Sequence, residues 1–176
     1  IGNGALASGL RSVALGTRAE ATNTGTIAIG DDAVASGVGS YAIGEDAEAS
    51  GFLSLAFGLR AVADQENALV IGHDSSATGE DAVAVGHNAA ASATNAVAFG
   101  NGTDATTIGA VAIGGDGDDA DTLGAQATGI QSTALGADAI ASGSEATALG
   151  YGAEASLTES TALGTNTVAS GTGSMA

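Results

Sequence analysis

The sequence predicts an all-β parallel β-solenoid, in which the chain winds into coils whose strands stack on one another. Residues before each recurring glycine alternate between large and small side chains, as in a strand. The 29 glycines interrupt every alanine-rich segment too often for a helix. A period that runs the whole chain outranks local propensity. The recurring glycines lie fourteen residues apart except across one longer gap: Gly2, Gly16, Gly30, Gly44, Gly58, Gly72, Gly86, Gly100, Gly114, Gly136, Gly150 and Gly164.

The first strand of each repeat precedes this glycine. We number the repeat from position 1 at Ser40 to position 14 at Leu53, so that the glycine is position 5. Position 4 is large and apolar, position 2 is usually so, and position 3 is alanine except at Val70. Position 1 is serine, threonine or alanine. The alternation predicts a short strand with one large face and one small face.

The second half of the repeat predicts a second strand. Positions 8 and 10 are small, as at Ala47 and Ala49, whereas positions 7 and 9 are polar or mixed. Glycine at position 5 and the Ser-Gly pairs, such as Ser50-Gly51, mark turns. Two strands and two turns make one coil that stacks about 4.8 Å from the next, so the twelve copies predict a rod roughly 55 to 60 Å long.

The large side chains must lie outside the coil, because the small faces of the two strands meet inside it. Alanine and serine fill only a thin interior, and the outer stripe is longer than a monomer normally exposes. Homo-oligomerisation around a closed axis is the simplest cover, and the pattern leaves open whether two or three subunits supply it. The expected interface residues are Val13, Leu15, Ile27, Ile29, Tyr41, Ile43, Leu55, Phe57, Leu69, Ile71, Val83, Val85, Val97, Phe99, Val111, Ile113, Leu135, Leu149 and Leu163.

The composition excludes some partners. Among 176 residues there are three arginines, no lysine and twenty carboxylates, which give a net charge of −17. Nucleic acid and anionic membranes would need a basic stripe. No run of eighteen apolar residues is present. The chain opens and stops inside a repeat, so we expect it to be part of a longer protein.

Three segments carry a family resemblance: Ser12-Val13-Ala14-Leu15-Gly16, Ser40-Tyr41-Ala42-Ile43-Gly44 and Ser160-Thr161-Ala162-Leu163-Gly164. This pattern resembles the head repeat of YadA-like trimeric autotransporter adhesins and covers residues 1–176 as one domain. The resemblance implies a left-handed parallel β-roll and a homotrimer packed through positions 2 and 4. It also implies a place at the tip of a fibre that a coiled-coil stalk and a β-barrel anchor to the outer membrane of a Gram-negative bacterium. The handedness comes from the resemblance alone, because the general crossover rule favours the right-handed form.

An acidic insertion interrupts the array. Gly114 and Gly136 lie twenty-two residues apart, one period plus eight, which predicts a protruding loop near residues 115–122. Its carboxylates and glycines have the composition that calcium favours, but not the spacing of an EF-hand. A solvated acidic loop is the alternative interpretation. The candidate calcium ligands are Asp116, Asp118, Asp119 and Asp121.

Two histidines fall in one column of the predicted solenoid. His73 and His87 both occupy position 6, so they are expected to stack in adjacent coils within reach of one metal ion or anion. That column offers no third ligand, since its neighbours are Leu59 and Asn101. Two solvated turn histidines are therefore the favoured interpretation.

The column at position 7 predicts ion pairs between coils. It reads Arg18, Asp32, Asp46, Arg60 and Asp74, so arginine meets carboxylate across neighbouring coils. Such exposed pairs contribute about 0.2 to 1 kcal/mol each. We interpret them as an aid to coil register and solubility.

The function predicted from the sequence is non-enzymatic adhesion. No serine, histidine and carboxylate are arranged as a nucleophilic site, and no cofactor motif is present. A stiff rod that repeats one surface pattern can attach a bacterium to host cells through many weak contacts. The resemblance suggests matrix proteins such as collagen, fibronectin or laminin as partners. A purely structural spacer or phage-fibre module is the main alternative; hexapeptide acyltransferases, with eighteen residues per coil, and ice-binding solenoids fit less well.

Overall fold

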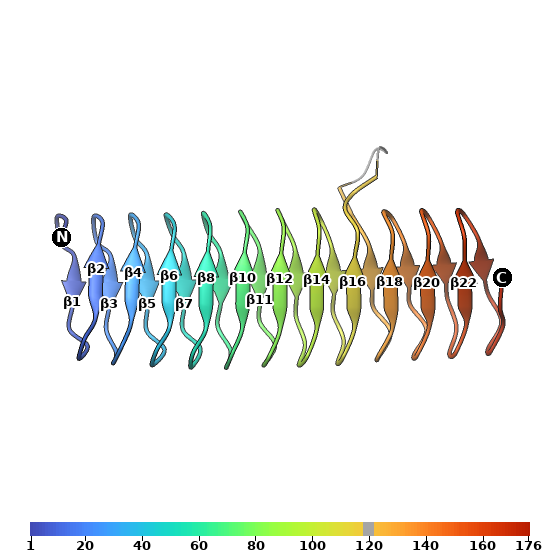
Figure 1. The fold of residues 1–176 in the computed structure, drawn as a ribbon, viewed down its shortest axis with the longest axis horizontal. Coiled ribbons are helices and arrows are strands. Elements are labelled where there is room, and N and C mark those ends of the chain that lie inside the picture. Colours follow the sequence, from blue (N-terminus) through green and yellow to red (C-terminus); the bar gives the residue numbers. More distant parts are fainter. Residues whose placement is uncertain (118–121) are drawn as a thin grey trace.

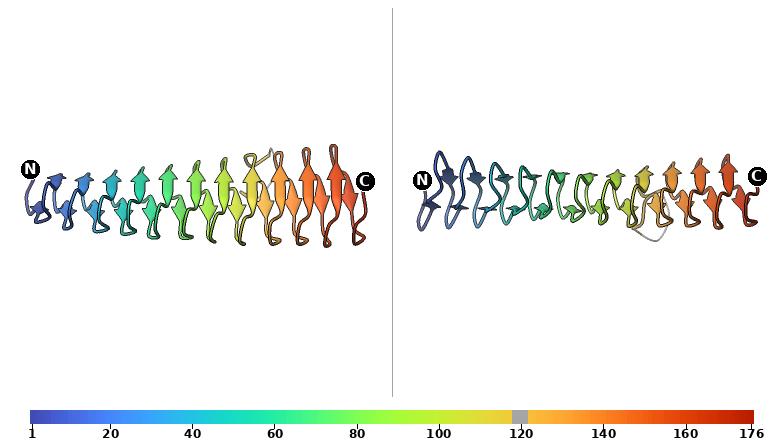
Figure 2. Two further views of the ribbon diagram at one scale, coloured as in Figure 1. Left: turned by 60° about the horizontal axis from the view of Figure 1, so that its bottom comes forward. Right: turned by 90° about the horizontal axis from the view of Figure 1, so that it is seen from below.

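The protein folds into a long, thin β-solenoid of about eleven coils (Figures 1 and 2). The computed structural model describes residues 1–117 and 122–176. Each coil contributes one strand to each of two parallel sheets. The two sheets run along the rod and face each other across a thin interior. The all-β parallel solenoid predicted from the sequence is confirmed.

One sheet holds the three-residue strands over positions 2 to 4. Within the described residues, its eleven strands are β2 (Val13–Leu15), β4 (Ile27–Ile29), β6 (Tyr41–Ile43), β8 (Leu55–Phe57), β10 (Leu69–Ile71), β12 (Val83–Val85), β14 (Val97–Phe99), β16 (Val111–Ile113), β18 (Thr133–Leu135), β20 (Thr147–Leu149) and β22 (Thr161–Leu163).

The other sheet holds two-residue strands over positions 9 and 10. In the part of the chain that the structure describes, its twelve strands are β1 (Leu6–Ala7), β3 (Glu20–Ala21), β5 (Val34–Ala35), β7 (Glu48–Ala49), β9 (Val62–Ala63), β11 (Ser76–Ala77), β13 (Ala90–Ala91), β15 (Asp104–Ala105), β17 (Gln126–Ala127), β19 (Ile140–Ala141), β21 (Glu154–Ala155) and β23 (Val168–Ala169).

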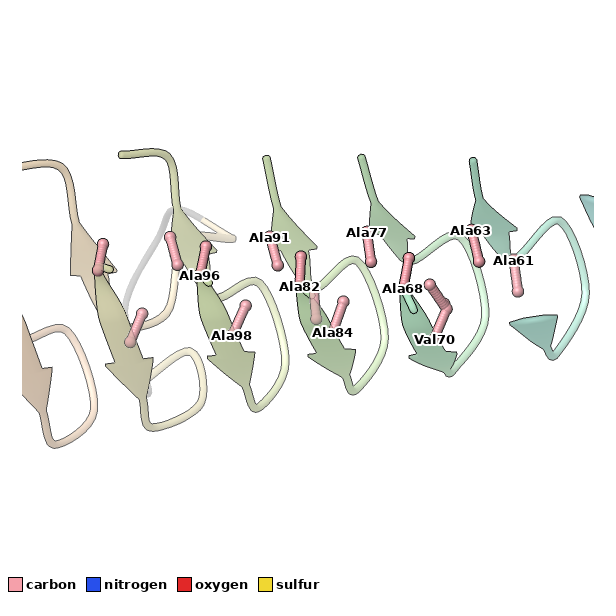
Figure 3. Close-up of a cluster of buried hydrophobic side chains, with 14 of the residues drawn as sticks. Ala61, Ala63, Ala68, Val70, Ala77, Ala82, Ala84, Ala91, Ala96 and Ala98 are labelled. Atoms are coloured by element: carbon pink, nitrogen blue, oxygen red, sulfur yellow. The ribbon is translucent and has the colours of Figure 1, made fainter. Parts of the chain in front are cut away.

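The interior is lined almost entirely by alanine. The side chains at positions 1, 3, 8 and 10 point between the two sheets, and nearly all of them are buried (Figure 3). Val70 is the largest fully buried side chain, and serine or threonine fills several of the remaining places. The thin interior predicted from the sequence is confirmed, and among the described residues the large apolar side chains other than Val70 lie outside it.

The second strand is shorter than the alternation alone would suggest. Position 7 adopts a left-handed backbone conformation, with φ of 55° at Asp46 and 55° at Arg18. A residue in this conformation cannot start a strand, so pairing begins at position 9. Position 14 is also left-handed, even where Leu53 stands. These two corners fix the flattened outline of the coil.

Position 5 is the corner that only glycine fits. At Gly44 φ is +144°, which L side chains rarely adopt. A Cβ built there would lie 2.2 Å from the carbonyl oxygen of Gly58 in the next coil. Glycine therefore recurs every fourteen residues for two reasons: the backbone conformation is unfavourable for other residues, and the next coil leaves no room for a Cβ.

The insertion leaves both sheets in register. Strand partners are fourteen residues apart elsewhere, but Val111 pairs with Thr133 and Asp104 pairs with Gln126. The amide of Asp116 donates to the carbonyl of Asn101 at 3.0 Å, as the position-7 amides of other coils do. The eight extra residues therefore lie between Asp116 and Ala125, two residues later than predicted.

A titration test follows from Asp104, the first residue of β15. Partial burial raises the pKa of its carboxyl above the ordinary 3.8. The folded chain thus holds this proton more tightly than the unfolded chain does, so the free energy of unfolding falls as pH rises through the range just above 3.8. We expect Asp104→Asn to raise Tm by roughly 1 to 2 °C at pH 7. Thermal unfolding monitored by circular dichroism should show this gain vanishing below pH 3.8, whereas Glu154→Gln, at the same position of a later coil, controls for the change in net charge. An equal gain at both pH values would contradict the prediction.

Candidate functional site

The outer side of the eleven-stranded sheet carries a continuous apolar stripe. We call the side chains at positions 2 and 4 of this sheet the apolar face. The structure places all nineteen predicted interface residues on it, and none of them is buried in the single chain. Phe99 is 53% exposed and Leu163 is 58% exposed. Neighbours in the same column cover one another in part, since strand register stacks Ile29 on Ile43 and Ile43 on Phe57.

The apolar face is unusual for the surface of a single soluble chain. Soluble monomers rarely expose a contiguous apolar patch of more than a few hundred Å². Each Val, Leu, Ile or Phe that becomes fully buried contributes about 1.5 to 3 kcal/mol. The single chain therefore carries a strong drive to cover this side of the rod, while its alanine interior offers no further place for large side chains.

A second candidate surface lies at the corner formed by positions 6 and 7. Arg18 forms a bidentate ion pair with Asp32, and Arg60 forms one with Asp74 in the next coil. The hydrogen bond from each arginine lowers the pKa of the carboxyl that it contacts. The predicted ion pairs between coils are confirmed for these two arginines.

His73 and His87 stack as predicted, and a third potential ligand joins them. The ring centroids are 5.1 Å apart, with an angle of 27° between the ring planes. One carboxylate oxygen of Asp74 lies 3.0 Å from Nε2 of His73. The sequence analysis looked for a third ligand only in the column of position 6, where the histidines stand. That was the wrong criterion, because Asp74 comes from the adjacent column of position 7. The sequence neighbour of His73 was the signal that could have identified it.

The acidic insertion can be placed only in part. The amide of Asp116 makes the position-7 hydrogen bond to the carbonyl of Asn101, although Asp116 does not share the positive φ of that position, and the amide of Gly117 donates to Oδ1 of Asp138 at 2.8 Å. The other three candidate calcium ligands, Asp118, Asp119 and Asp121, lie outside the described residues. The calcium site stays a prediction.

The remaining surface offers little else that could hold a small ligand. Across residues 1–117 and 122–176, no pocket is found. Within the same ranges, no helix has the length and apolar character required to cross a membrane. A uniform rod with a long exposed apolar face defines a repetitive β-solenoid.

Comparison with known families identifies the solenoid. The YadA head domain repeat matches residues 1–19, 7–33, 21–47, 35–51, 49–75, 77–103, 91–116, 125–156 and 158–176. The chain belongs to this family, which is an adhesin-type structural fold and not a known enzyme family. The unmatched segment between residues 116 and 125 coincides with the eight inserted residues. No curated protein matches the chain.

Proposed function

We propose that this chain forms the head of a trimeric adhesin on a bacterial surface and attaches the cell to host cells or extracellular matrix. The uncovered apolar face carries the proposal. Family membership indicates an adhesin-type role, and the wall of the rod repeats similar outward positions in every coil. Weak contacts made by many such positions add through multivalency.

In the proposed assembly, the apolar faces of three identical chains meet along a common axis. A closed arrangement lets each chain cover the same stripe on its neighbour and leaves no apolar edge. The coil is left-handed in this proposal, as in the family. The twelve-stranded sheet and the corners then face the host, and a C-terminal region outside this sequence anchors the fibre in the outer membrane.

Light scattering coupled to size exclusion tests the assembly. We expect a particle of three times the chain mass of 16.4 kDa, with a far-ultraviolet circular dichroism spectrum dominated by β structure. Burial of the apolar face is the driving force, so the trimer should persist on dilution and in high salt. A folded monomer in dilute buffer would overturn the proposal.

Solid-phase binding tests adhesion separately. The purified trimer is applied to wells coated with collagen, fibronectin or laminin, with serum albumin as the control surface. We expect saturable binding to at least one matrix protein and to cultured cells, and a large loss of apparent affinity when the heads are presented at low density. Failure to bind any matrix protein or cell would reject the adhesive role while leaving the trimer intact.

A spacer role is the second candidate, and the lack of a pocket in the described ranges favours it. A stiff rod can hold another domain away from the cell without binding anything itself. Absence of binding in the assay above, together with a trimeric mass, would support this role.

A further inference from the structure

The corner around His73 gathers ligands of the kind that transition metals prefer. His73, Asp74 and His87 each offer one ligand atom, and these three atoms lie within 4.8 Å of one another. Pairing of β10 with β12 fixes the two coils that carry them, because Leu69 to Ile71 align with Val83 to Val85. All three side chains are accessible to solvent. A metal ion could reach them without any change in the sheets.

Polar contacts with neighbouring side chains hold both imidazole rings at this corner. Nδ1 of His87 lies 3.0 Å from Oδ1 of Asn101, which can only accept, so Nδ1 carries the hydrogen and Nε2 is free to bind. Nε2 of His73 lies 2.8 Å from Nη2 of Arg60, which can only donate, and 3.0 Å from a carboxylate oxygen of Asp74, so this nitrogen faces both the arginine and the neighbouring carboxylate. Orientation of a ligating histidine by a polar partner on its other nitrogen, as Asn101 orients His87, is typical of metal sites.

Arg60 marks where a cation would sit. Its Nη2 contacts both Nε2 of His73 and Oδ2 of Asp74, the latter at 2.6 Å. The guanidinium therefore already places positive charge between two of the three ligands. Asp46 and Glu45 also attract this arginine electrostatically from the preceding coil. When a metal ion displaces it, Arg60 can turn toward these carboxylates, and exposed ion pairs cost little to exchange.

We propose that His73, Asp74 and His87 form a binding site for a divalent transition metal, with zinc as the best-suited ion. Two imidazole nitrogens and a carboxylate oxygen match the ligands of zinc, and water would complete the tetrahedron. The acidic surface, with a net charge of −17, concentrates cations around the rod. A bound ion would clamp two successive coils near the middle of the rod. The site is independent of the adhesive role.

Isothermal titration of the whole chain with zinc chloride tests the site. We expect one saturable zinc per chain, and at least a tenfold loss of affinity in His87→Ala and in Asp74→Asn. Arg60→Gln should bind zinc at least tenfold more tightly, since it removes the competing cation. Arg18→Gln is the matched control, because Arg18 makes the equivalent ion pair with Asp32 beside Asp31 rather than histidine, and it should leave zinc affinity unchanged.

A second measurement guards against misfolded variants. Zinc should raise Tm of the wild-type chain and of Arg18→Gln, but not that of His87→Ala, because an ion that binds only the folded state stabilises it. Non-saturating heat that is equal in wild type and His87→Ala would show diffuse binding to the acidic surface and would overturn the proposal. So would tight binding that survives both His87→Ala and Asp74→Asn.

Discussion

Ile43→Asp is expected to abolish the assembled head. Ile43 lies within the apolar face, in β6, stacked between Ile29 and Phe57. In the proposed trimer this substitution buries three carboxylates against apolar side chains, at a cost of about 3 to 5 kcal/mol for each unpaired buried charge. The alanine interior buries little apolar area, so in the proposed assembly the interface supplies much of the stability. We therefore expect loss of the trimer together with loss of β structure, read by light scattering and circular dichroism.

Val62→Glu is the matched control for Ile43→Asp. Val62 lies in β9 at position 9, on the outer side of the other sheet, where Glu20, Glu48 and Glu154 already stand in other coils. The change adds a charge of the same sign within two coils of Ile43. We expect Val62→Glu to remain trimeric and folded. A stable trimer in Ile43→Asp would show that the apolar face is not the interface.

Gly44→Ala is expected to lower the free energy of unfolding by at least about 3 kcal/mol per chain. The added Cβ would lie 2.2 Å from the carbonyl oxygen of Gly58 and 2.5 Å from its carbonyl carbon. Both atoms belong to the backbone of the next coil, so relief requires the two coils to separate. The backbone at φ +144° is strained for alanine in addition. Urea unfolding followed by circular dichroism measures the loss.

Gly25→Asn provides the comparison for Gly44→Ala. Gly25 also has positive φ, +71°, but its Cβ would meet nothing closer than the Cα of Gly39 at 3.9 Å. Asn67 and Asn95 occupy the same repeat position with the same left-handed backbone. We expect a change below about 0.5 kcal/mol. Equal losses in the two variants would mean that coil contact is not what demands glycine at position 5.

The sequence predicted the faces of the solenoid better than its corners. Alternation at Tyr41, Ala42 and Ile43 defines which side chains point outward, because one strand residue follows another onto the opposite face. The left-handed conformations of Arg18 and Leu53 could not be predicted from residue type, since neither side chain favours positive φ. Contacts to the next coil, repeated along the array, impose that conformation.

The candidate metal site was half predicted for a related reason. Period fourteen brings His73 above His87, so the stacked pair follows from arithmetic alone. Asp74 projects to the same corner only because the backbone at position 7 turns with φ of 56°. The number of subunits could not be predicted from the sequence. An apolar stripe indicates that another chain covers it, but the angle at which identical rods meet depends on their three-dimensional shape.

The uninterrupted register across the acidic insertion has a practical consequence. The sequence has eight additional residues between Asp116 and Ala125, yet the neighbouring strand pairs keep their register. We therefore expect this corner to accept an inserted peptide segment, which a stiff, multivalent scaffold would then display. Variation in displayed epitopes can accumulate at such a point, by natural selection or by protein engineering, while the wall of the rod stays the same.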